Sequence, residues 1–130
     1  MRCLNIEKPT LYSPQIGEKG LTPLHYYCWW YHPPAIKWAL KNNGDIHALD
    51  DVYRQTPLLM LGKIYSGSLK RKKHCFRLLV NAGADVFAEG KNGNNLLQET
   101  KNMGSKGFKR FIRSEFKRRA NAAKKTVDKN

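Results

Sequence analysis

Acidic residues are scarce in this chain. Its 130 residues include 24 lysines and arginines but only 10 aspartates and glutamates, a formal net charge of +14. Cysteine is scarce too, and three scattered thiols do not suit a disulfide framework. A run of about 18 apolar residues and an apolar secretory segment at the start are both absent. We therefore expect an intracellular protein, of the cytoplasm or nucleus.

Motifs of catalysis are missing as well. The sequence has no glycine-rich phosphate loop and no nucleophile elbow. The best candidate for a metal site combines His25, Cys28 and His32 with His74 and Cys75, but structural zinc sites use tighter paired spacings. We predict a non-enzymatic protein without catalytic, metal or cofactor residues.

Two short motifs occur twice. The segment GLTPLH at residues 20–25 returns as RQTPLL at 54–59, and NGDIHA at 43–48 returns as GADVFA at 83–88. The first pair is 34 residues apart and the second 40. Interleaved motifs at such a period indicate stacked helical units of about 33 residues, with an insertion in the second.

Each motif has a mechanical reason. The hydroxyl of Thr22 can cap a helix, and Pro23 then occupies the first helical position, where its missing amide costs nothing. Asn43 and Gly83 are the residue types that tolerate the left-handed conformation after a helix. These signals predict helices near residues 23–31, 34–42, 57–65, 69–81, 96–102 and 106–124, with projecting turns at 45–55 and 85–94.

Over residues 20–116 the chain resembles the ankyrin repeat family. The resemblance implies an all-α helical solenoid of about three helix-turn-helix repeats, near residues 20–53, 54–92 and 93–125, with projecting turns and a basic C-terminal capping helix. Residues 1–19 would be an N-terminal arm or degenerate cap, and 126–130 a frayed tail. In the family the histidine of the first motif bonds back to the threonine, as His25 can, whereas Leu59 replaces it in the second unit.

The resemblance also implies a macromolecular partner. We expect this partner to be a protein, and an acidic protein is one option. Members occur in eukaryotes, in viruses and among proteins that intracellular bacteria deliver into host cells, so a host-interacting role is one expectation. Three alternatives remain open for the surroundings of the aromatic run at residues 26–31: solvent, the N-terminal arm, or the partner. Carried to matching positions, the partner-binding residues of the concave face and turns are Tyr26, Trp29, Asp50, Asp51, Tyr53, Arg54, Met60, Lys63, Glu89, Lys91 and Asn92.

Positive charge collects in the C-terminal half. Residues 1–60 hold 6 basic and 5 acidic residues, whereas residues 101–130 hold 11 and 2. This charge either keeps a small stack in solution or binds an acidic protein, nucleic acid without base specificity, or an anionic membrane. Docking of the apolar stripe Phe108, Phe111, Ile112 and Phe116 onto the stack would argue against a membrane. The predicted basic patch comprises Lys70, Arg71, Lys72, Lys73, Lys109, Arg110, Arg113, Lys117, Arg118 and Arg119; the oligomeric state stays open.

Overall fold

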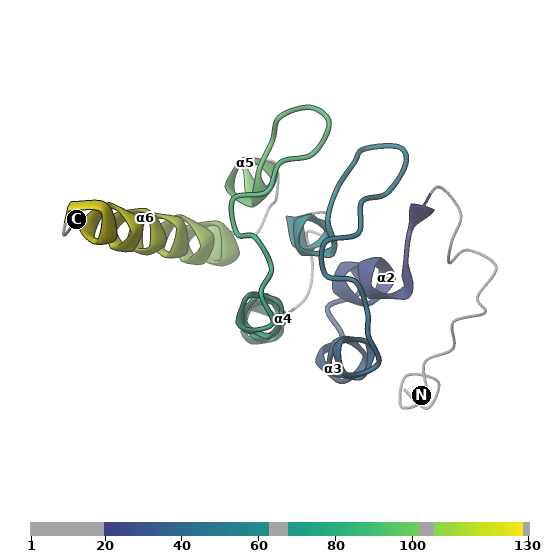
Figure 1. Ribbon diagram of the computed structural model, residues 1–130. Coiled ribbons are helices and arrows are strands. Elements are labelled where there is room, and N and C mark those ends of the chain that lie inside the picture. The colour runs from purple at the N-terminus through teal and green to yellow at the C-terminus, as the bar shows by residue number, and fades with distance from the viewer. Residues whose placement is uncertain (1–19, 63–67, 102–105, 129–130) are drawn as a thin grey trace.

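A computed structural model of the chain describes residues 20–62, 68–101 and 106–128, with side chains up to residue 122. These residues form helices and no strands. The helices stack in two layers, with α2, η2 and α5 in one and α3 and α4 in the other, and two loops project from the first layer (Figure 1). The elements are α2 (Pro23–Trp29), α3 (Pro33–Lys41), the 3-10 helix η2 (Pro57–Gly62), α4 (Leu69–Asn81), α5 (Leu96–Thr100) and α6 (Lys106–Asp128).

The helices begin and end where their capping residues require. Thr22 caps α2, and its side chain accepts a hydrogen bond from the backbone of His25. Asn95 caps α5 in the same way, with Gln98 as the reciprocal partner. After α3 and α4 the chain turns at Asn43 (φ 65°) and Gly83 (φ 104°), which confirms the two left-handed positions expected from the repeat.

Several boundaries differ from the expected ones. The second unit opens with a 3-10 helix, not an α-helix, and it begins with a bond from the Leu59 N–H to the Thr56 C=O. The first helix is shorter than predicted, because Tyr31 already has φ 53°. α6 runs to Asp128, so it includes part of the predicted tail at 126–130. The predicted arm at 1–19 lies outside the described residues.

The core runs continuously through the stack. Five successive elements each contribute an aliphatic side chain that is at most 1% exposed: Leu24, Ile36, Leu58, Leu79 and Leu96. Each such side chain contributes about 2 kcal/mol of transfer free energy. No single helix pair encloses this core, which is why the units must stack.

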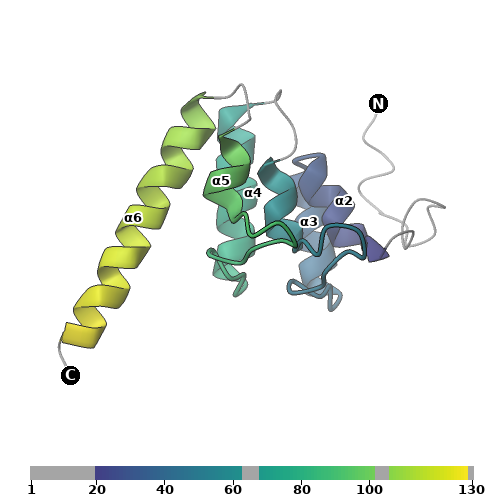
Figure 2. The same ribbon diagram turned by 90° about the horizontal axis from the view of Figure 1, so that it is seen from above.

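The last helix closes the stack. Phe108, Ile112 and Phe116 of α6 are buried, so the predicted docking of the apolar stripe is confirmed. Gly107 permits this approach, because a Cβ there would lie 2.8 Å from a methyl carbon of Leu69 on α4. Figure 2 shows α6 beginning beside α4 and α5 and then diverging from the stack.

Candidate functional site

The first projecting loop is built around Asp50. Its Oδ2 accepts hydrogen bonds from the N–H groups of Val52 (3.0 Å) and Tyr53 (2.9 Å), and its Oδ1 accepts one from Gln55 (2.7 Å). Burial by itself raises the pKa of Asp50, but the three amide bonds outweigh it and the net pKa is lowered. The ionised carboxylate therefore fixes the loop from inside.

His25 ties this loop to α2. Its Nε2 lies 2.8 Å from the carbonyl oxygen of Gln55, and its Nδ1 accepts the N–H of Thr22 at 3.1 Å. These bonds require the neutral tautomer that carries its proton on Nε2. Burial lowers the pKa of His25 and so favours that neutral form.

The second loop lies against the first. The N–H of Lys91 donates to the carbonyl oxygen of Tyr53 at 2.7 Å, and the N–H of Gly90 donates to that of Asn94 at 3.0 Å. Asp45 and Asp85, the matching aspartates of the two repeats, each accept the N–H two residues ahead, at 2.9 and 3.0 Å. The loops therefore form one ordered edge above the helices.

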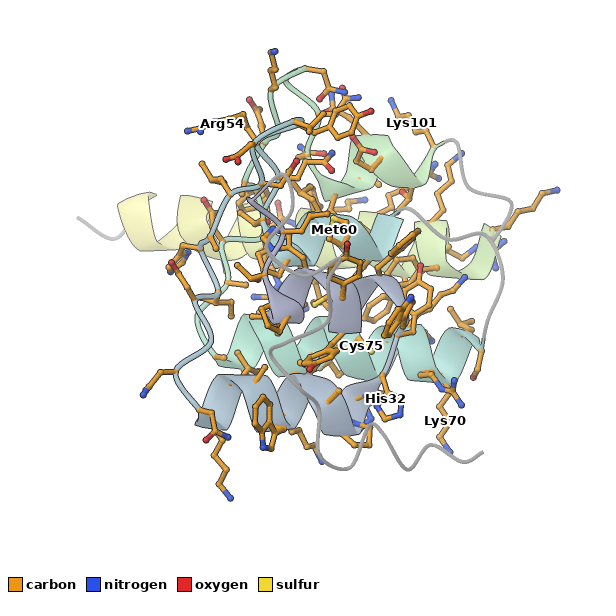
Figure 3. The ribbon with its side chains drawn as sticks, turned by 90° about the vertical axis from the view of Figure 1, so that its right-hand side faces the viewer. His32, Arg54, Met60, Lys70, Cys75 and Lys101 are labelled. Atoms are coloured by element: carbon orange, nitrogen blue, oxygen red, sulfur yellow. The ribbon has the colours of Figure 1, made fainter. Side chains whose placement is uncertain are left out.

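A pocket of about 410 Å³ opens between α2, the first loop and η2. Figure 3 shows Met60 near the middle of this side of the molecule, with Arg54 on the loop above it. The carboxylate of Asp50 is already occupied by amides, and the Nε2 of Gln55 donates to Glu99 at 3.4 Å. The remaining walls are mainly apolar and aromatic, which suits an apolar side chain. The lining residues are Leu21, Tyr26, Trp29, Asp50, Val52, Tyr53, Gln55 and Met60.

Five of the predicted partner-binding residues meet in this pocket: Tyr26, Trp29, Asp50, Tyr53 and Met60. Asp50 lines the pocket but is only 3% exposed, because its carboxylate accepts hydrogen bonds from the loop backbone; that it contacts a partner stays a prediction. The other predicted loop residues are exposed and do not line the pocket: Asp51, Arg54, Glu89, Lys91 and Asn92. Lys63 lies outside the described residues.

Sequence reasoning missed Leu21, Val52 and Gln55. Val52 carried a usable signal, because an apolar residue in the middle of a polar turn has no local reason to be there. The aromatic run divides around the pocket: Tyr27 and Tyr31 are 5% and 3% exposed, whereas Trp29 and Trp30 are 36% and 56% exposed. The ring of Tyr26 lies 6.2 Å from that of Trp29, which gives the pocket one aromatic wall.

One member of the predicted basic patch is buried in the core. Lys72 is wrong as a surface residue, because it is fully buried with its Nζ 5.2 Å from the ring centroid of Tyr31 and 5.9 Å from that of Phe108. Burial lowers its pKa. Lys73 lies over the ring of Phe111 in the seam between α4 and α6. The exposed members are Lys70, Arg71, Arg110, Arg113, Lys117 and Arg118, and the half-buried ones are Lys73, Lys109 and Arg119.

The histidines and cysteines do not assemble into a metal site in the described ranges, where no three His, Cys, Asp or Glu side chains gather into a group that could hold an ion. Both ring nitrogens of His25 are engaged in hydrogen bonds. Burial raises the pKa of the Cys28 and Cys75 thiols, that of Cys75 to about 12. None of the helices in the described part of the chain is long and apolar enough to cross a bilayer.

The architecture is a helical solenoid of a few repeats that carries ordered loops along one edge. A profile of the ankyrin repeat family matches residues 19–51, the segment that supplies α2, α3 and the start of the first loop. Residues 19–51 thus match one ankyrin repeat in sequence, and the helices that follow continue the same plan along the stack. No curated protein matches the chain. Ankyrin repeats generally mediate protein–protein interactions and are typically non-enzymatic scaffolds.

Proposed function

We propose that this protein is a non-enzymatic binding module that holds a protein partner against α2, η2 and the first loop. The pocket between these elements carries the proposal, because residues distant in sequence supply a largely apolar site on an otherwise charged molecule. The partner inserts an apolar side chain there. Tyr and Trp walls suit such an anchor, since they offer large apolar area at low cost in conformational entropy.

The pocket is held in shape before any partner arrives. His25 fixes α2 to the loop, and the carboxylate of Asp50 fixes the loop to itself. A rigid site loses less entropy on binding than one that must be ordered first. The exposed loop residues Asp51, Arg54 and Lys91 then form a polar rim around the anchor.

The setting and the boundaries of the binding unit belong to the same proposal. We expect the protein to act inside cells, where the buried free thiols of Cys28 and Cys75 stay reduced. Residues 20–125 are the binding unit. A host protein as the partner would be one case of the same binding mode.

A matched pair of loop variants tests the anchor. Val52 and Leu49 are exposed to 38% and 39% in the same loop, but only Val52 lines the pocket. The wild-type protein would be used to select binders from a random peptide library displayed on phage. We expect the selected peptides to share a bulky apolar residue and to lose tenfold or more in affinity, about 1.4 kcal/mol, against Val52→Asp but not against Leu49→Asp.

Two results would contradict the pocket. One is equal binding of the selected peptides to both variants; the other is a set of peptides without a shared apolar residue. A salt titration adds an independent reading, because binding through an apolar anchor weakens only modestly between low and high salt. Steep salt dependence of the same peptides would assign them to the basic surface instead.

A further inference from the structure

The outward side of α6 carries an ordered row of cations. Lys106, Arg110, Arg113 and Lys117 are all exposed, and their spacing of i, i+4, i+7 and i+11 aligns them along one side of the helix. At 1.5 Å per residue the row is about 16 Å long. It lies on the side opposite to the buried residues Phe108, Ile112 and Phe116.

Further cations widen the row. With 100° of turn per residue, Lys109 and Arg118 lie on its two sides, so basic side chains cover about half of the girth of the helix, and the outermost of them, Arg118, also pairs with Glu115. Glu115, the one acidic residue at positions 106–122, lies on the side of α6 that faces the stack. It is paired there with Arg118 and Arg119 at 2.6 and 3.2 Å. We call the half of the helix surface formed by the row with Lys109 and Arg118 the outward arc. It contains no acidic residue up to residue 122.

Apolar anchors are missing from this surface. The exposed large hydrophobic residues of the described chain are Trp29, Trp30, Leu49, Val52, Tyr53 and Phe87, none of which is on α6. A protein interface usually has an apolar or aromatic centre, and a helix that enters a membrane needs its apolar stripe. The stripe of α6 is used for docking. Single-stranded nucleic acid would require exposed rings for base stacking, and the outward arc has none.

We infer that the outward arc of α6 is a second binding surface, which takes the sugar–phosphate backbone of double-stranded DNA without reading its sequence. An α-helix with its side chains is about 10–12 Å wide, and the major groove of B-DNA is about 12 Å wide. Cations over half of the girth then reach the phosphates on both walls of the groove. α6 lies at the end of the stack, where its outward side meets none of the other described helices (Figures 1 and 2). The inference does not depend on the function proposed for the pocket.

Fluorescence anisotropy with a labelled 20-base-pair duplex tests the inference. With about four phosphate contacts, the affinity should fall roughly 150-fold between 50 and 200 mM salt, a slope of about −3.6 in log K against log salt. Duplexes of unrelated sequence should bind equally. A single strand of the same length, a polyglutamate peptide and vesicles with anionic lipids should each bind at least about tenfold more weakly at equal ionic strength.

Two charge-reversed pairs of substitutions distinguish binding at a defined site from attraction by the net charge of the protein. Arg113→Glu with Lys117→Glu changes the outward arc, and Lys37→Glu with Lys41→Glu makes the same change in charge at exposed i, i+4 positions on α3. We expect the first pair to weaken duplex binding about 30-fold or more and the second less than about threefold. The neutral pair Arg113→Gln with Lys117→Gln should reduce the salt slope by about 2.

The inference fails if both charge-reversed pairs weaken binding equally, or if the duplex does not bind at 50 mM salt. Tighter binding of polyglutamate or of the anionic vesicles than of the duplex would assign the surface to an acidic protein or to a membrane. Circular dichroism should show unchanged helix content in every variant. Because the neutral pair adds no repulsion, its salt slope decides the matter even if the charge-reversed pair unfolds.

Discussion

The first helices of repeats one and two begin with the same three residues but fold differently. Thr22, Pro23 and Leu24 open the α-helix α2, whereas Thr56, Pro57 and Leu58 open the 3-10 helix η2. In repeat one the ring of His25 reaches the Thr22 side chain at 2.8 Å. In repeat two the matching residue is Leu59, and the buried Thr56 Oγ1 has no hydrogen-bond partner in the described structure.

The difference shows how much one imidazole ring contributes to the first repeat. A single side chain closes the cap of α2 and also carries the bond to the Gln55 carbonyl in the first loop. The second repeat relies on packing instead: Gly62 lets η2 approach α5 closely, because a Cβ there would lie 2.8 Å from the Glu99 Cβ. Four predictions test this contrast, from the largest expected effect to the smallest.

Converting repeat one to the chemistry of repeat two should have the largest effect. His25→Leu removes three hydrogen bonds: the one to the buried Gln55 carbonyl, which keeps only the Asp50 N–H at 3.2 Å, and the two that join the ring to the backbone and side chain of Thr22. Each hydrogen bond contributes about 0.5–1.5 kcal/mol, so we expect the three losses to lower the free energy of unfolding by urea by about 3 kcal/mol. The exposed His47→Leu is the control, and its effect should stay below about 0.5 kcal/mol. Similar losses in both variants would show that the ring bonds contribute little.

The two helix ends provide the next comparison. Gly83 has φ 104°, and a Cβ at this position would meet no atom within 4 Å, so Gly83→Ala should cost about 1.5 kcal/mol through backbone strain alone. Asn43→Gly, at φ 65° in repeat one, should instead change stability by only a few tenths of a kcal/mol. Thermal unfolding of the two variants measures both effects. A larger cost at Asn43 than at Gly83 would contradict the equivalence of the two helix ends.

The two threonines should respond in opposite directions. Thr22→Val removes a working cap and should cost about 1 kcal/mol. Thr56→Val removes a buried hydroxyl without a partner and should raise the free energy of unfolding by about 0.5 kcal/mol or more. Chemical denaturation of both variants gives the comparison directly. Equal losses would mean that Thr56 has a hydrogen bond equivalent to that of Thr22.

Much of this fold was predictable because its signals are local. Caps such as Thr22, and the left-handed positions Asn43 and Gly83, depend on residues within one turn of the chain. The stripe of α6 was predictable for the same reason. The sequence did not predict that η2 would be a 3-10 helix; η2 packs against α2, α4 and α5, so residues well outside its own turn surround it.

The candidate site was predictable only in part. The family resemblance predicted Tyr26, Trp29 and Met60 as residues of one face, and the structure brings them to one pocket. The resemblance named Asp50 as a partner contact and the charge distribution put Lys72 in the basic patch, but both side chains are buried. Their burial depends on where the loop amides and the rings of Tyr31 and Phe108 lie, and spacing in one chain carries no such information.

The smallest of the four expected effects is a decrease in the free energy of unfolding as pH falls. Burial lowers the pKa of His25 in the folded protein, while the carboxylates of Asp50 and Asp45 oppose this shift only in part. As pH falls, His25 therefore binds a proton in the unfolded chain, near pH 6.5, before it does so in the folded protein. The stability that neutral His25 contributes is complete above pH 6.5 and is lost as pH falls through and below that value. One such group accounts for at most about 0.7 kcal/mol between pH 7 and pH 6.

Urea unfolding at pH 7 and pH 6 measures this loss, with His25→Gln as the variant that cannot titrate. Burial also lowers the pKa of His32, whose Nδ1 accepts the Ala35 N–H, so part of the pH dependence should remain in that variant. His25→Gln together with His32→Asn should reduce it further. If the pH dependence of His25→Gln equals that of the wild type, His25 keeps its ordinary pKa in the folded state, and its ring does not need to be neutral to join α2 to the first loop.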